Sequence, residues 1–186
     1  MNRMVRQSLK RALVLLGLCL TAPGIAAAGP VAELACLEQA ISAEQSSALV
    51  SGVGEGRVAP KQDLQPGVAA VVACARRFEW TRAEVQAASH YMPALFAQRR
   101  FRAELAGQSL DLAWVEREVA ADEALVAAAG ELRGTPPELM AFLTRIAPSI
   151  AEWQVRHSED RAALTAFGGF VAATALVEGT RRRFAR

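Results

Sequence analysis

The sequence predicts an all-α fold, a single bundle of five or six mostly antiparallel helices with one disulfide. Apolar residues make up 52% of the 186 residues and aromatic residues only 6%. Much of the apolar share is alanine, which has the highest helix propensity, whereas a sheet would need more β-branched and aromatic residues. Apolar positions recur at steps of three and four, and capping signals precede several of these stretches. Composition, periodicity and caps therefore agree on helices.

The first 28 residues are expected to be a cleaved secretory signal peptide. Four basic residues lie within the first eleven, an apolar run covers 12–20, and small residues precede a cleavage position after Ala28. A membrane anchor would need about 20 apolar residues, and the apolar run over 12–20 is shorter than that. A lipoprotein signal would need a small residue before its acylated cysteine, but Leu18 precedes Cys19. We therefore expect a periplasmic or secreted protein with one helical domain over residues 29–186.

Removing residues 1–28 also changes the charge of the chain. This segment holds four of the 21 basic residues and none of the 19 acidic ones, so the remaining chain has a formal net charge of −2. Nucleic-acid binding usually needs a strongly basic domain or stripe. We therefore expect no nucleic-acid partner.

Two cysteines, Cys36 and Cys74, remain after the signal peptide. In an oxidising compartment an isolated pair favours a disulfide, and a separation of 38 residues excludes a local CxxC redox motif. The alternative is two buried free thiols that pack as small apolar groups. We expect a structural Cys36–Cys74 disulfide.

The first half of the mature chain predicts three helices. Apolar spacing predicts one helix over 31–51 and a second over 68–78, which the disulfide would join as a hairpin. Glycines and prolines predict a loop over 51–67. This loop lacks the Gly-Lys-Ser/Thr ending of a phosphate-binding loop, so no nucleotide site is expected. A capping box at Thr81 and Glu84 begins the third helix, which should continue to about Leu105.

Three further helices are expected in the second half. The fourth begins near Asp111 and continues to about Gly130, with Leu112, Val115, Val119 and Val126 facing inward. The fifth begins at the cap Thr135, and its apolar stripe is Leu139, Leu143, Ile146, Ile150 and Trp153. The sixth covers about 159–178.

Prolines inside the third and fifth helices, Pro93 and Pro148, should kink or break them. A kink can shape a pocket between helices, and His90, Tyr91 and Arg99 lie near the first one. We consider a binding cleft in which Arg99 or Arg100 holds an anionic ligand and His90 and Tyr91 donate protons. The favoured alternative is a curved helix with a solvated polar face.

The sequence assembles no catalytic or metal-binding set, so we expect no cofactor. Three residues before His90 and His157 stand Ala87 and Gln154, not the glutamate of a helical di-metal site. His157 is expected to cover the end of the core. The carboxylates of the fourth helix are interpreted as a solvated acidic face with Arg117 as counter-charge; they are Glu116, Glu118, Asp122 and Glu123.

Residues 162–177 form an uncharged stretch followed by Arg181, Arg182 and Arg183. We favour a buried central helix. A C-terminal membrane anchor and an oligomer contact are the alternatives, since Gly168 and Gly169 are spaced with alanines to admit another helix. The arginines would complement a helix C-terminus, or else contact acidic membrane surfaces.

These observations predict an exported, non-catalytic binding or protein-interaction module, whose partner is another envelope protein. The first alternative is a small cofactor-independent enzyme or anionic-ligand carrier with a cleft at Pro93. The second is an envelope protein anchored to the membrane by its C-terminal helix. The sequence leaves the oligomeric state open.

Overall fold

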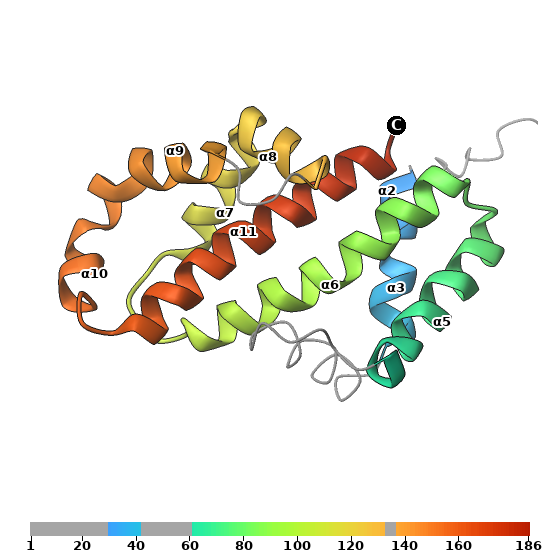
Figure 1. The fold of residues 1–186 in the computed structure, drawn as a ribbon, viewed down its shortest axis with the longest axis horizontal. Helices are drawn as coiled ribbons and strands as arrows, with labels where there is room; N and C mark the ends of the chain where they lie inside the picture. The colour runs from blue at the N-terminus through green and yellow to red at the C-terminus, as the bar shows by residue number, and fades with distance from the viewer. Residues whose placement is uncertain (1–29, 42–60, 133–136) are drawn as a thin grey trace, which may run out of the picture.

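The computed structural model describes residues 30–41, 61–132 and 137–186, and within these ranges the chain is helical with no strand (Figure 1). The predicted all-α bundle with one disulfide is confirmed. The helices are α2 (Pro30–Glu33), α3 (Ala35–Ala40), α5 (Lys61–Phe78), α6 (Arg82–Glu104), α7 (Leu112–Ala121), α8 (Glu123–Gly130), α9 (Pro137–Ile146), the 3₁₀ turn η1 (Ala147–Ile150), α10 (Ala151–Arg156) and α11 (Arg161–Phe184).

The centre of the bundle is the antiparallel pair of long helices α6 and α11 (Figure 1). Helices α2, α3 and α5 lie beside one end of the pair, whereas α7, α8, α9 and α10 cover α11 from the other side. Two apolar clusters fill the interior. One joins α3 and α5 to α6, and the other joins α7 to α10 with α11 around the fully buried Phe170.

Helix α11 belongs to both clusters, which explains its low charge. Its buried side chains include Phe167, Phe170 and Val177. Within the described ranges it is the helix whose length and composition would also suit a membrane span, and 56% of its most apolar window is covered by the bundle. Core helices commonly share these properties. The helix begins where Asp160 accepts a hydrogen bond from the Ala163 amide at 3.0 Å, and it extends six residues beyond the predicted end at 178.

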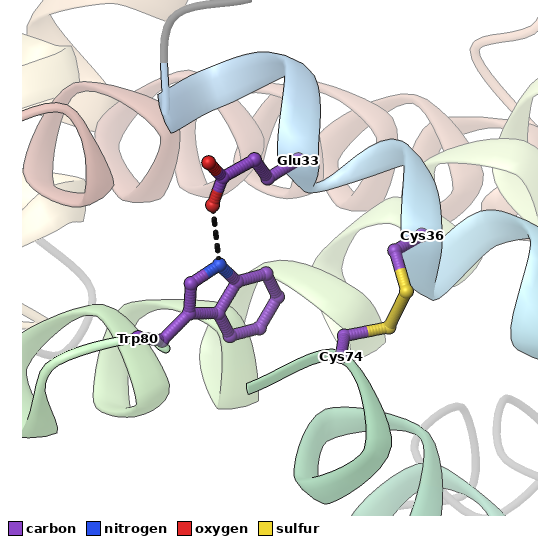
Figure 2. The surroundings of a disulfide bond; sticks show 4 residues. All are labelled: Glu33, Cys36, Cys74 and Trp80. Carbon is purple, nitrogen blue, oxygen red and sulfur yellow. Dashed lines mark hydrogen bonds between the residues drawn. A yellow bond between two sulfur atoms is a disulfide. The ribbon is translucent and has the colours of Figure 1, made fainter. Parts of the chain in front are cut away.

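The disulfide between Cys36 and Cys74 joins α3 to α5, with the two Cα atoms 6.0 Å apart (Figure 2). Beside it, the Trp80 indole Nε1 donates a hydrogen bond to the Glu33 carboxylate at 2.6 Å. The Trp80 ring also meets Phe184 edge-on, with 5.0 Å between ring centroids. The N-terminal segment is thus attached both to α5 and to the end of α11.

Two predicted boundaries in this half are wrong. The loop expected over 51–67 is helical from Lys61, because most of its glycines and prolines precede that residue and the early turns of α5 accommodate Pro66. The first helix is interrupted at Leu34 and ends at Ala40, since Ile41 has extended backbone angles. The rest of that predicted helix lies outside the described residues, as do the signal peptide and the Thr135 cap.

The two internal prolines have different outcomes. A kink or a break was predicted at Pro93; helix α6 is continuous through this residue, so the break does not occur. Proline removes only one hydrogen bond, to the carbonyl of Ser89, and α6 packs against α11 along its length. At Pro148 the predicted break is confirmed, because the chain passes from α9 through η1 into α10.

The predicted fourth helix is two helices. Asp122 ends α7 and caps α8, with its carboxylate accepting from the Leu125 amide at 3.0 Å. Val115, Val119 and Val126 face inward as predicted. The capping box of Thr81 and Glu84 that begins α6 is also confirmed.

Candidate functional site

Two of the three residues expected near the α6 cleft meet the same carboxylate. The Tyr91 hydroxyl is buried and lies 3.1 Å from the Glu38 carboxylate on α3. Arg99, two turns further along α6, forms an ion pair with the other oxygen of Glu38. On the opposite side Arg181 donates to the Tyr91 hydroxyl at 3.3 Å. Burial raises the pKa of Tyr91 above its ordinary value, with Arg181 acting against that rise, so the phenol stays protonated at neutral pH.

His90 lies apart from this group. Its imidazole is half-buried, and burial, followed by the nearby charge of Arg183, lowers its pKa. Among the described residues no hydrogen bond joins it to Tyr91 or Arg99. Arg99 is already paired with Glu38, so the anion-binding role predicted for it would require that pair to open.

A groove of about 540 Å³ lies between α6, α7 and α11, next to the Tyr91–Arg181 contact. Its floor is polar: the Gln98 amide donates to the Thr174 hydroxyl and to Glu116, each at 3.1 Å. Thr174 is buried and in turn donates to the Phe170 carbonyl at 2.8 Å. The lining residues are Gln98, Ala113, Glu116, Arg117, Ala120, Thr174, Glu178 and Arg181.

The charges in the groove are unequally paired. Glu116 forms an ion pair with Arg102, and Glu178 forms one with Arg181 at 2.9 Å. Arg117 is exposed and forms no ion pair within the part of the chain that the structure describes. As far as the described residues show, the groove presents one uncompensated cation, Arg117, beside hydroxyl, amide and carboxylate groups.

The acidic face of α7 and α8 takes its counter-charge from another helix. Arg145 of α9 contacts Glu118 at 3.0 Å and Asp122 at 3.2 Å, so the expectation that Arg117 neutralises these carboxylates is wrong. Residues far apart in sequence supply the pairing. Within the described ranges no group of three His, Cys, Asp or Glu side chains could hold a metal ion.

His157 covers the end of the core as expected. Its ring stacks on Trp153 with 4.8 Å between centroids, and its Nδ1 lies 2.9 Å from the Trp153 carbonyl oxygen.

The C-terminal arginines cap neighbouring helices. Arg182 donates to the Ala120 carbonyl in the last turn of α7 at 2.8 Å, and Arg183 donates to the Gly130 carbonyl at the end of α8 at 3.5 Å. The last carbonyls of a helix lack partners within that helix, and cations there complement the dipole. This packing accounts for the arginine cluster; membrane contact through Arg181, Arg182 and Arg183 stays a prediction.

The lowered pKa of His90 predicts a pH-dependent stability. A histidine whose pKa is lower in the folded state than in the unfolded state binds its proton more readily when unfolded. The free energy of unfolding should therefore fall as the pH drops below about 6.5, the ordinary value for histidine, toward the lower folded-state pKa. Urea denaturation between pH 7.5 and pH 5 measures this slope. His90→Gln should flatten it relative to His157→Gln, and equal slopes in all three proteins would contradict it.

Sequence reasoning missed Glu38 as the common partner of Tyr91 and Arg99. It also missed Gln98, Thr174 and Arg117 as members of one groove. One usable signal was Thr174, a polar residue in the middle of an otherwise apolar helix. The other partners could not be assigned without the fold, since Gln98 and Thr174 are 76 positions apart. No protein-family model matches the chain, and neither the curated proteins nor the solved structures include a significant match.

Proposed function

We propose that the protein is an exported, non-catalytic binding module that docks a partner protein of the cell envelope on the groove between α6, α7 and α11. The observation that carries this proposal is Arg117, a cation on the wall of a solvent-open polar groove that has no ion-pair partner among the described residues. An acidic side chain of a partner would compensate this charge. Hydrogen bonds that involve a charged group contribute about 1.5–3 kcal/mol, more than neutral ones.

The rigidity of the groove supports recognition. Its floor is fixed by the Gln98–Thr174 hydrogen bond, and its end is fixed by the contacts of Arg181 with Tyr91 and Glu178. A site held in place in advance loses less conformational entropy when it binds. The disulfide-linked α3 adds to this support because Glu38 holds Tyr91 from the far side.

A second candidate function is the transport or sequestration of a small anionic ligand at the same groove. The unpaired Arg117 favours this reading too, since a free carboxylate could occupy the same position as a partner's acidic side chain. The two candidates differ in whether the surface around the groove is covered on binding.

Photo-crosslinking in living cells of the native host distinguishes the two candidates. A photoreactive residue at Ala113, on the groove, should give a discrete covalent adduct with an envelope protein. The same residue at Ala162, about 18 Å along α11 from Thr174 by helix rise, serves as control. Adducts from both positions, or from neither, would contradict a docking surface at the groove.

Substitution of Arg117 tests whether its positive charge contributes to binding of the partner. Arg117→Gln should reduce the Ala113 adduct about tenfold, the change that about 1.4 kcal/mol produces, whereas Arg76→Gln on the exposed side of α5 should leave it unchanged.

For the second candidate, citrate titrated into the purified protein should bind in the wild type and bind more weakly in Arg117→Gln. Citrate binding without any adduct would favour the carrier.

A further inference from the structure

A second cavity, of about 430 Å³, lies between the start of α7 and the break at Pro148. It is lined by two tryptophans, Trp114 and Trp153, which are 39 positions apart in the sequence and are brought together by the fold. Ligand cavities in proteins typically have volumes of about 300–1,000 Å³. The other lining residues are Ser109, Leu110, Asp111, Pro148, Ser149, Ile150, Ala151, Glu152 and Arg156.

Trp153, which lines this cavity, has a polar atom without a partner among the described residues. Trp153 is 2% exposed, and within ranges 30–41, 61–132 and 137–186 its buried indole Nε1 has no hydrogen-bond acceptor. The indole of Trp80, in contrast, donates to Glu33 at 2.6 Å (Figure 2). Buried polar groups are nearly always hydrogen-bonded, so an indole N–H without a protein acceptor is unusual.

The charged residues of the cavity are free to bind. Glu152 and Arg156 are one helical turn apart on α10, and both are exposed. In the described part of the chain neither forms an ion pair with the other or with a third residue. Across the cavity, one carboxylate oxygen of Asp111 accepts from the Trp114 amide at 2.8 Å, which leaves its other oxygen available. The cavity therefore offers strong acceptors and a strong donor side by side.

We propose that this cavity binds a neutral mono- or disaccharide. Each sugar hydroxyl both donates and accepts, so it can donate to Glu152 or Asp111 while it accepts from Arg156. The ring C–H groups of a sugar are weakly positive and pack on the negatively charged face of an indole such as Trp114. A sugar oxygen that reached the Trp153 indole N–H would also supply the acceptor that it lacks among the described residues.

The charge balance favours a neutral ligand over a charged one. Asp111 and Glu152 would repel an anion, and Arg156 would repel an organic cation that otherwise suits two tryptophan faces. A neutral ligand with several hydroxyl groups can hydrogen-bond to Asp111, Glu152 and Arg156 without electrostatic repulsion from any of them. This site shares no lining residue with the groove of α6, α7 and α11, so it is independent of the function proposed above.

The three tryptophan indole N–H signals in a ¹⁵N–¹H NMR spectrum provide the test. N-acetylglucosamine and cellobiose are titrated into the purified protein, with choline and citrate as charged probes. A saccharide should shift the Trp153 and Trp114 signals with one common binding curve, and the Trp153 signal should move downfield. The Trp80 signal should stay in place because its acceptor, Glu33, is unchanged.

Several outcomes would overturn the proposal. One is the absence of saturable shifts with either saccharide. Another is an equal shift of all three indoles, which indicates non-specific binding. A shift of the Trp114 and Trp153 signals by choline or citrate alone would show that the cavity takes a charged ligand instead.

Paired variants separate binding from folding. Glu152→Gln should weaken saccharide binding about tenfold, the change expected when a charged hydrogen bond is lost, and Glu159→Gln, on an exposed residue outside the cavity, should leave it unchanged. Trp153→Phe should also weaken binding because it removes the indole N–H, and since the smaller ring leaves a void in the core, its thermal unfolding is measured beside its affinity to confirm that the variant is folded. Wild-type affinity in both Glu152→Gln and Trp153→Phe would contradict the assignment.

Discussion

Loss of the Cys36–Cys74 disulfide is expected to lower the free energy of unfolding by about 3–4 kcal/mol. Closing a loop of 38 residues removes conformational entropy from the unfolded chain, and the estimate follows from the length of that loop. The fold adds a local reason. Helix α3 has only six residues, too few to be stable alone, so its position depends on this bond and on contacts such as Tyr91–Glu38.

Urea denaturation with and without a thiol reductant measures the effect. The double variant Cys36→Ala/Cys74→Ala should match the reduced wild type, and the reductant should not change it further. Amide hydrogen exchange should show the largest loss of protection in α3. An oxidised protein no more stable than the reduced one would contradict the prediction.

Local signals in the sequence predicted the helices well because local interactions decide them. The Thr81 capping box lies within four residues of sequence, and the inward stripe of α7 and α8 repeats at helical spacing. The interruption at Asp122 was missed because aspartate can occupy a helix interior or cap a new helix, and only packing decides between them. Packing likewise decides the outcome at the two prolines: α6 continues through Pro93, whereas α9 ends before Pro148.

The candidate sites could not be predicted because their members come from distant parts of the chain. The sequence singled out His90, Tyr91 and Arg99 for their closeness along one helix. The fold instead joins Tyr91 and Arg99 through Glu38 and leaves His90 beside Arg183. Helical periodicity shows which face of a helix is buried, but not which other helix supplies the facing charge.

The glycines of α11 also show that spacing along one helix does not identify where another helix packs closely. The small-residue spacing drew attention to Gly168 and Gly169 as places where another helix could approach. A Cβ atom on Gly168 would meet nothing within 4 Å, and one on Gly169 would meet the Phe101 side chain. The close backbone approach is at Gly179, which faces Gly130 of α8.

Gly179→Ala is expected to destabilise the protein by about 3 kcal/mol, the upper end of the usual cost of overpacking. The new Cβ would lie 2.5 Å from the Gly130 amide nitrogen and 2.6 Å from the Val126 carbonyl oxygen. Both are backbone atoms of α8, so no side chain can turn away and the two helices must separate. Their separation would also strain the hydrogen bond from Arg183 to the Gly130 carbonyl.

Gly168→Ala is the matched control, since it makes the same chemical change in the same helix. Alanine favours a helix over glycine by up to about 1 kcal/mol, and space is available at this position, so stability should rise. At roughly 2–4 °C per kcal/mol for a chain of this size, thermal unfolding should separate the variants clearly: the Tm falls in Gly179→Ala and rises in Gly168→Ala. Equal shifts in the two variants would mean that helix propensity alone determines both effects, and that the close contact of α8 with α11 imposes no cost on a Cβ atom at 179.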